Sequence, residues 1–324
     1  MSNFLDPAIL FFVLGVLAGV LKSNLEIPQP ISRFLSLYLL MALGLKGGFA
    51  LAHSGFSTEV VGAIAVAITL AIVIPLIGFQ FIKRVTDELN AAAVAATYGS
   101  VSAVTFITAT RYLDEQGVAF GGHMAAAMAL MESPAIIIAI LLVNAQRRKT
   151  NPAQTGKHGQ HGLGMILKES LTDGAQILLL GAMLVGLLSG DAGKAAMQPF
   201  SGNLFTGMLA FFLLDMGLAT ARNFPPLKQM PKGLLAYALL APPLHATLAL
   251  GLALLVGVPA PDAGLLMVLA ASASYIAVPA VMRFAVPEAN PSLYFGLSLG
   301  VTFPINILIG IPAYIGIAEK VIGL

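Results

Sequence analysis

The sequence contains no cysteine and few charged residues. Without cysteine the chain cannot form disulfide bonds, thiolate metal sites or a cysteine nucleophile. Only 10% of its 324 residues are charged and 58% are hydrophobic, whereas soluble domains carry roughly 25% charged residues. The chain has no P-loop and no His-Glu-x-x-His motif, so nucleotide-driven pumping and metal-dependent hydrolysis lack sequence support. The composition predicts an all-α integral membrane protein that is not an enzyme.

Apolar stretches long enough to cross about 30 Å of hydrocarbon recur along the whole chain. Charged residues, prolines and glycines divide them into ten candidate transmembrane spans. A long polar segment, rich in Pro, Gly, Gln and Lys, predicts a flexible linker at residues 144–172. The linker separates two halves of five spans each, residues 1–143 and 173–324. The expected spans are 8–22, 30–51, 60–82, 89–112, 118–143, 173–189, 200–221, 233–257, 262–284 and 293–318.

Lys and Arg are distributed unequally between the two sides that these spans define. Thirteen of the seventeen lie on the side of the linker, and positive residues favour the cytoplasmic side of a membrane. We therefore expect a cytoplasmic linker, both termini on the opposite side, and an inverted second half, because each half has an odd number of spans. The thirteen are Lys22, Arg33, Lys83, Arg84, Arg147, Arg148, Lys149, Lys157, Lys168, Arg222, Lys228, Lys232 and Arg283.

Several residues of the first half recur in the second half at a nearly constant offset. Inverted repeats of this kind are typical of secondary transporters, and interrupted helices at corresponding positions mark their binding sites. The recurrences are Ser100, Ser102 and Arg111 with Ser272, Ser274 and Arg283 at an offset of 172, Gly44 with Gly217 at 173, and Pro134 with Pro304 at 170.

The segments "TYGSVSAVTF" in span four and "AASASYIAVP" in span nine are predicted to interrupt their helices in mid-membrane. An interrupted helix exposes unpaired N–H groups, and its N-terminus carries about half a positive charge. Two such ends, with serine hydroxyls beside them, favour a small monovalent oxyanion. The serines could instead be small residues that let helices approach closely.

Glu132 lies inside predicted span five, where an ionised carboxylate costs a few kcal/mol or more. We expect it to bind a cation or a proton, and the alternative is a protonated structural acid. Arg111 and Arg283 end their spans, so we expect both to snorkel to the interface. His123 and His245 are expected to be structural.

Five stretches carry a resemblance to a known family. The chain resembles the cyanobacterial-type sodium-dependent bicarbonate transporter family over essentially its whole length. The stretches are "IPQPISRFLSLYLLMALGLKGGFAL", "YGSVSAVTF", "LMESPAIIIAILLVN", "AASASYIAVP" and "VPEANPSLYFG".

The resemblance implies a bacterial inner-membrane permease of ten transmembrane helices in two inverted five-helix repeats, with discontinuous helices four and nine and periplasmic termini. A core domain of spans 3–5 and 8–10 moves against a gate domain of spans 1, 2, 6 and 7. The implied assembly is a homotrimer, and the implied ligands are bicarbonate and the coupling ion Na⁺, with no other cofactor. In cyanobacterial members a PII-like regulator docks on the cytoplasmic face.

Carried over onto this chain, the resemblance assigns two sets of residues. Tyr275 stands where cyanobacterial members have a carboxylate, so proton coupling through Glu132 is an alternative to sodium. The substrate-binding set is Gly99, Ser100, Ser102, Thr105, Ser272, Ala273 and Ser274, and the cation-binding set is Glu132, Ser102, Ser274 and Tyr275.

The sequence therefore predicts sodium-coupled bicarbonate uptake by alternating access. Two alternatives stay open. One is a sodium- or proton-coupled carrier of another small anion, such as a monocarboxylate. The other is a membrane receptor or scaffold that transports nothing and presents its linker to a cytoplasmic regulator.

Overall fold

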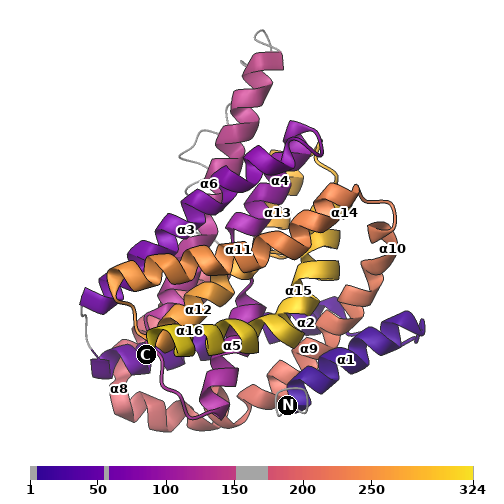
Figure 1. The fold of residues 1–324 in the computed structure, drawn as a ribbon. Coiled ribbons are helices and arrows are strands. Elements are labelled where there is room, and N and C mark those ends of the chain that lie inside the picture. The colour runs from indigo at the N-terminus through magenta and orange to yellow at the C-terminus, as the bar shows by residue number, and fades with distance from the viewer. Residues whose placement is uncertain (1–5, 55–57, 151–173, 324) are drawn as a thin grey trace.

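The computed structural model describes residues 6–54, 58–150 and 174–323, and every regular element in these ranges is a helix (Figure 1). Within these described ranges, seven helical stretches are long and apolar enough to cross a membrane. They are Gln29–Ala52, Thr58–Ile82, Glu88–Glu115, Met124–Asn144, Ile177–Arg222, Lys232–Val256 and Pro291–Ile322, and two shorter apolar helices are Pro7–Val20 and Ala260–Ala271. Length and apolarity both fit an integral membrane protein.

The first half contains α1 (Pro7–Val20), α2 (Gln29–Ser54), α3 (Thr58–Ile82), α4 (Glu88–Gly99), α5 (Ala103–Glu115) and α6 (Met124–Thr150). The second half contains α8 (Gly174–Met197), α9 (Phe205–Arg222), α10 (Phe224–Leu227), α11 (Lys232–Val256), α12 (Ala260–Ala271), α13 (Ala277–Ala285), α14 (Pro291–Leu297), α15 (Phe303–Ile305) and α16 (Ile311–Ile322). Three π-helical turns, Gln198–Asn203, Ser298–Thr302 and Asn306–Gly310, join neighbouring helices of the second half.

Both predicted interruptions are present. α4 ends at Gly99 and α5 begins at Ala103, and α12 ends at Ala271 and α13 begins at Ala277. Each break contains small and hydroxyl-bearing residues, which favour non-helical backbone through side-chain hydrogen bonds of their own.

One expected boundary in the first half is wrong. Span five was expected to begin at residue 118, but α6 begins at Met124. Gly117 has a φ of 68°, which lies in the left-handed region and ends α5 in a loop. The first residues of the predicted linker, 144–150, continue α6 to Thr150 because Gln, Arg and Lys are good helix formers. The rest of the predicted linker lies outside the described residues.

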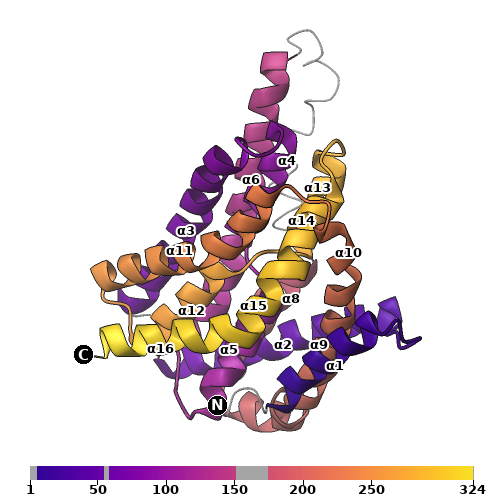
Figure 2. The same cartoon turned by 45° about the vertical axis from the view of Figure 1, so that its right-hand side comes forward.

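The helices pack into two groups. The four-helix group consists of α1, which lies along α9, and α2, which lies along α8. The crossing group consists of α3 to α6 and α11 to α16, in which α3 packs on α4, α6 and α11, and α12 packs on α11 and α16. Figure 2 shows α1, α2 and α9 together at the lower right and α3, α4 and α11 at the upper left. Both interruptions belong to the crossing group.

Glycines set the closest approaches inside the four-helix group. A Cβ on Gly217 of α9 would lie 2.2 Å from the Phe12 carbonyl oxygen of α1. A Cβ on Gly48 of α2 would lie 2.1 Å from the Met183 carbonyl oxygen of α8. Both pairs therefore cross backbone to backbone, as helices with small residues do in membranes.

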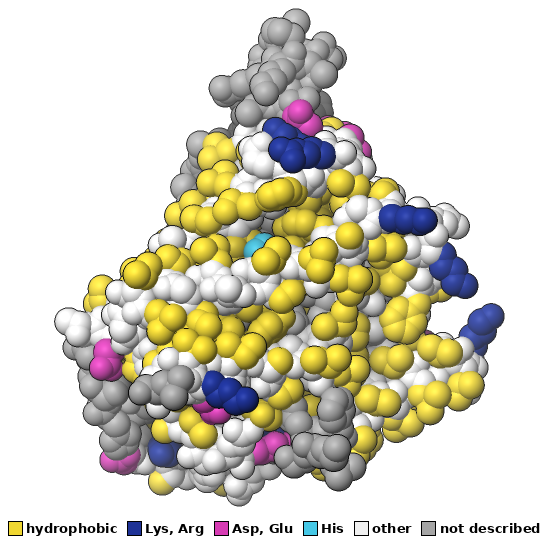
Figure 3. Space-filling model, viewed as in Figure 1, with side chains coloured by type: hydrophobic (Ala, Val, Ile, Leu, Met, Phe, Trp, Pro, Cys, Tyr) yellow, Lys and Arg dark blue, Asp and Glu magenta, His cyan; other side chains and the backbone are white. Residues whose placement is uncertain are grey.

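The surface and the chain ends agree with a membrane-embedded body. Apolar side chains cover most of the face in Figure 3, and charged side chains lie towards its margins. The start of α1 and the end of α16 lie in the lower part of Figures 1 and 2, opposite the far end of α6.

The crossing of α1 and α9 generates a stability prediction. We expect Gly217→Ala to lower the free energy of unfolding by about 1–3 kcal/mol, because the added methyl group meets backbone and forces the helices apart. Gly207 of the same helix has no atom within 4 Å of its Cβ position, so Gly207→Ala is the matched control. Thermal unfolding in detergent measures both, and equal midpoints for the two variants would contradict the close crossing.

Candidate functional site

The two interruptions meet, and each donates a backbone hydrogen bond to the other half. The Ser102 N–H donates to Ser272 Oγ at 2.9 Å. The Ser274 N–H donates to the Thr97 carbonyl oxygen at 2.8 Å. All four residues are buried. Residues about 170 positions apart in the sequence therefore form one site, which we call the serine crossing.

Two helix N-termini begin at the serine crossing. Ser102 is the N-cap of α5, and its Oγ accepts from the Thr105 N–H at 3.2 Å and from Thr105 Oγ1 at 2.9 Å. At the start of α13, Ser274 Oγ accepts from the Val278 N–H at 3.3 Å. Each N-terminus carries roughly half a positive charge. The site thus has a positive potential without an Arg or Lys in its hydrogen bonds.

The serine hydroxyls differ in how much of their bonding capacity is in use. Ser272 Oγ donates to the Leu269 carbonyl oxygen at 2.8 Å while accepting from Ser102, so its proton is already engaged. Ser100 is 1% exposed, and its Oγ has no hydrogen-bond partner among the described residues. Since a buried hydroxyl normally has a partner, Ser100 is the hydroxyl best placed to bind a ligand.

Gly99 and Ala273 contribute small size and backbone. A Cβ on Gly99 would lie 2.6 Å from the Pro75 ring of α3, so glycine is needed for α4 to approach α3 where α4 ends. Ala273 lies in the α12–α13 interruption and is buried. Neither side chain can donate a hydrogen bond, so any role in binding would be through the backbone.

Tyr275 packs at the crossing without supplying charge. Its ring meets the edge of Phe303 at a centroid distance of 5.2 Å. Its hydroxyl is buried close to Ser102 but makes no hydrogen bond of normal geometry within the described residues. A neutral phenol is a weaker ligand for a hard cation than a carboxylate.

Glu132 is half-buried in α6, about 12 Å along the helix axis from Met124 at 1.5 Å per residue. The hydrogen bonds that join the two interruptions do not involve it. The structure thus brings together Ser102, Ser272 and Ser274, with Thr105 and Tyr275 beside them.

Asn306 is a site residue that the sequence analysis missed. Its Nδ2 donates to the carbonyl oxygen of Ala271, the last residue of α12, at 2.8 Å. It is 1% exposed, and its Oδ1 has no partner within the described ranges. The available signal was an amide inside an apolar span, which is expensive unless it has a partner.

Tyr98 was missed as well. Its hydroxyl and Thr302 Oγ1 share a hydrogen bond of 2.6 Å, and Thr302 Oγ1 donates to the Ala238 carbonyl oxygen at 3.3 Å. This buried chain of bonds ties α4, just before its break, to α11 and the last helices.

Residues 296–300 read Gly-Leu-Ser-Leu-Gly, the spacing of a hydrolase nucleophile elbow. Ser298 is fully buried, begins a π-helical turn, and donates to the Tyr294 carbonyl oxygen at 2.7 Å. An elbow needs an exposed serine between a strand and a helix, so this match does not indicate an enzyme.

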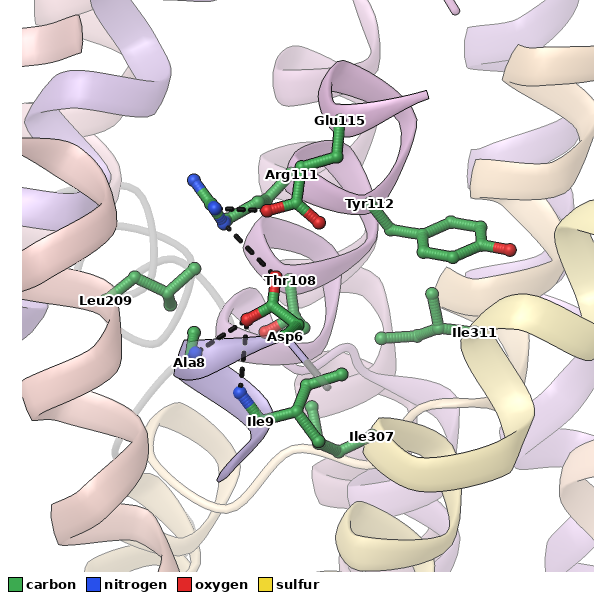
Figure 4. Close-up of a pocket in the computed structure, with 10 residues that line it drawn as sticks. All are labelled: Asp6, Ala8, Ile9, Thr108, Arg111, Tyr112, Glu115, Leu209, Ile307 and Ile311. Atoms are coloured by element: carbon green, nitrogen blue, oxygen red, sulfur yellow. Dashed lines mark hydrogen bonds and ion pairs between the residues drawn. The ribbon is translucent and has the colours of Figure 1, made fainter. Parts of the chain in front are cut away.

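Arg111 lies near the end of α5, where it contacts charged and polar groups. Its side chain is only 19% exposed and lies in a pocket between Asp6 and Glu115 (Figure 4). The carboxylates of Asp6 and Glu115 and the Thr206 hydroxyl contact the guanidinium. The expectation that Arg111 snorkels to the membrane interface stays a prediction. The side chain of Arg283 lies outside the described residues.

The two histidines inside the fold are buried, as expected of structural groups. His123 Nε2 lies 3.4 Å from Asp262 Oδ2, and Asp262 Oδ1 accepts from the Gly121 N–H at 2.7 Å. Burial lowers the pKa of the His123 imidazole, against the opposing effect of the Asp262 carboxylate. His245 stacks edge-on against Tyr237.

The sequence model of the Na⁺-dependent bicarbonate transporter superfamily matches residues 7–319. The chain belongs to this superfamily. The resemblance predicted from the five stretches is confirmed, and membership makes the chain a multi-pass membrane transporter and not an enzyme. The substrates that the family implies are bicarbonate and Na⁺. No curated protein matches the chain.

The serine crossing generates a second stability prediction. We expect Ser272→Ala to lower the free energy of unfolding by about 1–3 kcal/mol, because the buried Ser102 N–H loses its acceptor. Ser100→Ala removes a hydroxyl that has no partner in the described part of the chain, so its unfolding midpoint should match that of the unmodified protein. Thermal unfolding of both variants in detergent is the measurement. A larger loss for Ser100→Ala would show that the two serines have been assigned the wrong way round.

Proposed function

We propose that the protein takes up bicarbonate together with Na⁺ by alternating access. The observation that carries this proposal is the buried serine crossing, where two interrupted helices from opposite halves of the chain bond to each other. Its two helix N-termini attract an anion without a fixed cation. Because the site has no fixed cation, we expect it to bind a small anion together with one cation.

The anion is expected beside Ser100 and the first turn of α5. Bicarbonate has a hydroxyl that donates a hydrogen bond and oxygens that accept one. A serine hydroxyl can bind either, because it both donates and accepts. Gly99 and Ala273 add backbone groups, while Ser102, Thr105, Ser272 and Ser274 hold the two interruptions in register.

The sodium ion is expected to bind oxygen atoms close to the anion. Hard cations take hydroxyl, carbonyl and carboxylate oxygens. We assign Ser102, Ser274, Tyr275 and Glu132 to this set, and the buried Oδ1 of Asn306 is a further oxygen of the right kind. Because Tyr275 is neutral, the anion itself supplies part of the charge that the cation needs.

The movement is expected between the two helix groups. In the proposed inverted repeat, α1 corresponds to α8 and α2 to α9, and the pairing of α1 with α9 and of α8 with α2 has the exchanged pattern that an inverted repeat requires. The four-helix group would be the gate and the crossing group the core.

We propose ten membrane-spanning units, a homotrimer in the bacterial inner membrane, periplasmic termini, and a cytoplasmic face that a PII-like regulator could bind.

Uptake of labelled bicarbonate into proteoliposomes tests the proposal. We expect uptake to require an inward Na⁺ gradient and to be reduced by competing bicarbonate, and less by acetate or formate. Sodium-independent uptake of a monocarboxylate would overturn the assignment in favour of the alternative carrier, which the neutral Tyr275 makes the second candidate. Glu132→Gln separates the couplings, because it should abolish a proton-driven uptake.

Ser100→Ala tests the site itself. A hydrogen bond to a charged ligand contributes about 1.5–3 kcal/mol, so the apparent affinity for bicarbonate should fall by about tenfold or more at unchanged stability. Ser292, an exposed serine at the start of α14, provides the control Ser292→Ala. Unchanged bicarbonate affinity in Ser100→Ala would overturn the assignment of Ser100. Absence of any uptake by the folded, unmodified protein would favour the scaffold.

A further inference from the structure

The end of α5 that lies near the start of α1, which we call its outer end, is held by charged and polar contacts from several helices. The Arg111 guanidinium lies 3.8 Å from Asp6, ahead of α1, and also contacts Glu115 and the Thr206 hydroxyl of α9 (Figure 4). Figure 4 shows Arg111 between the two carboxylates, with Asp6 also capping the first turn of α1. One side chain thus connects α5 to two helices of the four-helix group.

A second contact holds the neighbouring face of α5. Lys46 Nζ of α2 lies 3.2 Å from Asp114 Oδ2. The same ammonium lies over the Phe205 ring of α9 at 4.3 Å from its centroid. Lys46 therefore has an acidic partner in the crossing group and an aromatic partner in its own group, which fixes its position.

Both contacts cross the boundary between the two helix groups. α5 packs on α12 and α16 of the crossing group. Its partners come from the four-helix group: Lys46 lies in α2, Thr206 lies in α9, and Asp6 immediately precedes α1. The loop after α5 approaches α2 in the same region, since a Cβ on Gly122 would lie 2.2 Å from the Gly47 carbonyl oxygen. The outer side of the boundary is therefore closed by direct contact.

The closed region lies beyond the serine crossing on the same helix. Thr108, Ile307 and Ile311 line the pocket beside Arg111. Thr108 is six residues beyond Ser102, which is about 9 Å along a helix. A solute arriving from the outer side and following α5 would have to pass the Arg111 cluster before it reached the crossing.

We propose that Arg111 with Asp6, Glu115 and Thr206, and Lys46 with Asp114, form an outer latch that keeps the path to the serine crossing closed. This inference rests on the proposed alternating access between the two groups. Partly exposed ion pairs suit such a latch because water can replace the partners when the groups separate. The structure accordingly represents the conformation that is closed on the outer side.

The absence of native cysteine allows a direct test in the full-length protein. Thr108→Cys places one thiol behind the latch, and its labelling by a membrane-impermeant maleimide from the outer side reports access. We expect slow labelling when the latch is intact. Adding Arg111→Gln or Asp114→Asn should raise the labelling rate about five- to tenfold, the scale of one or two weak ion pairs.

Matched controls separate opening from unrelated effects. Glu319→Gln removes an exposed acid near the end of α16 and should leave the labelling rate of Thr108→Cys unchanged. Gln116→Cys, on the exposed loop after α5, should label equally fast in every background. Lys46→Glu and Asp114→Lys should each raise the rate of Thr108→Cys, and their combination should restore slow labelling because the pair is rebuilt with reversed charge.

Two results would overturn the latch. The first is an unchanged labelling rate of Thr108→Cys when Arg111→Gln or Asp114→Asn is added to the folded protein. The second is fast labelling that persists when Lys46→Glu and Asp114→Lys are combined. Labelling needs no transported substrate. The latch can therefore fail while sodium-coupled bicarbonate uptake succeeds, and it can hold while uptake proves to involve another anion.

Discussion

Hydrogen bonding between two interrupted helices is the constraint on which the rest of this structure depends. Inside a bilayer no water can satisfy the backbone groups that a broken helix exposes, so the protein must supply partners. Ser102 and Ser274 meet this requirement across the halves of the chain, and Asn306 does so for the end of α12. The groups left over, such as the Ser100 hydroxyl, then define a small polar site within an apolar body.

The helix groups are held together by two different kinds of contact. Inside the four-helix group, glycines let backbones touch, and such crossings resist separation because any shift loses close packing. Between the groups, the outer contacts at Arg111 and Lys46 are partly exposed ion pairs. Tightly packed helix pairs within the four-helix group, and ion pairs between the groups that water can replace, fit the relative motion that we propose for the two groups.

Much of the fold could be predicted because the bilayer restricts what a sequence can do. Apolar length predicted membrane-crossing helices, of which seven are long and apolar enough among the described residues, and the recurring serines located both interruptions. The start of span five was wrong because an apolar pattern continues past Gly117, which ends α5 in a loop. Residues 144–150 are polar but form helix readily, so α6 continues to Thr150. The partners of Arg111 could not be predicted because Asp6 and Thr206 are distant in sequence.

By itself, the sequence determined the membrane class, the family and the positions of the two broken helices, since apolar length, charge and small polar residues act locally. Only the tertiary structure decided which hydroxyl is already engaged and which is open, that Asn306 joins the crossing, and that Arg111 bridges the helix groups. These properties depend on which atoms meet after the chain folds, and hydrogen-bond partners 35 to 170 positions apart leave no pattern along a single sequence.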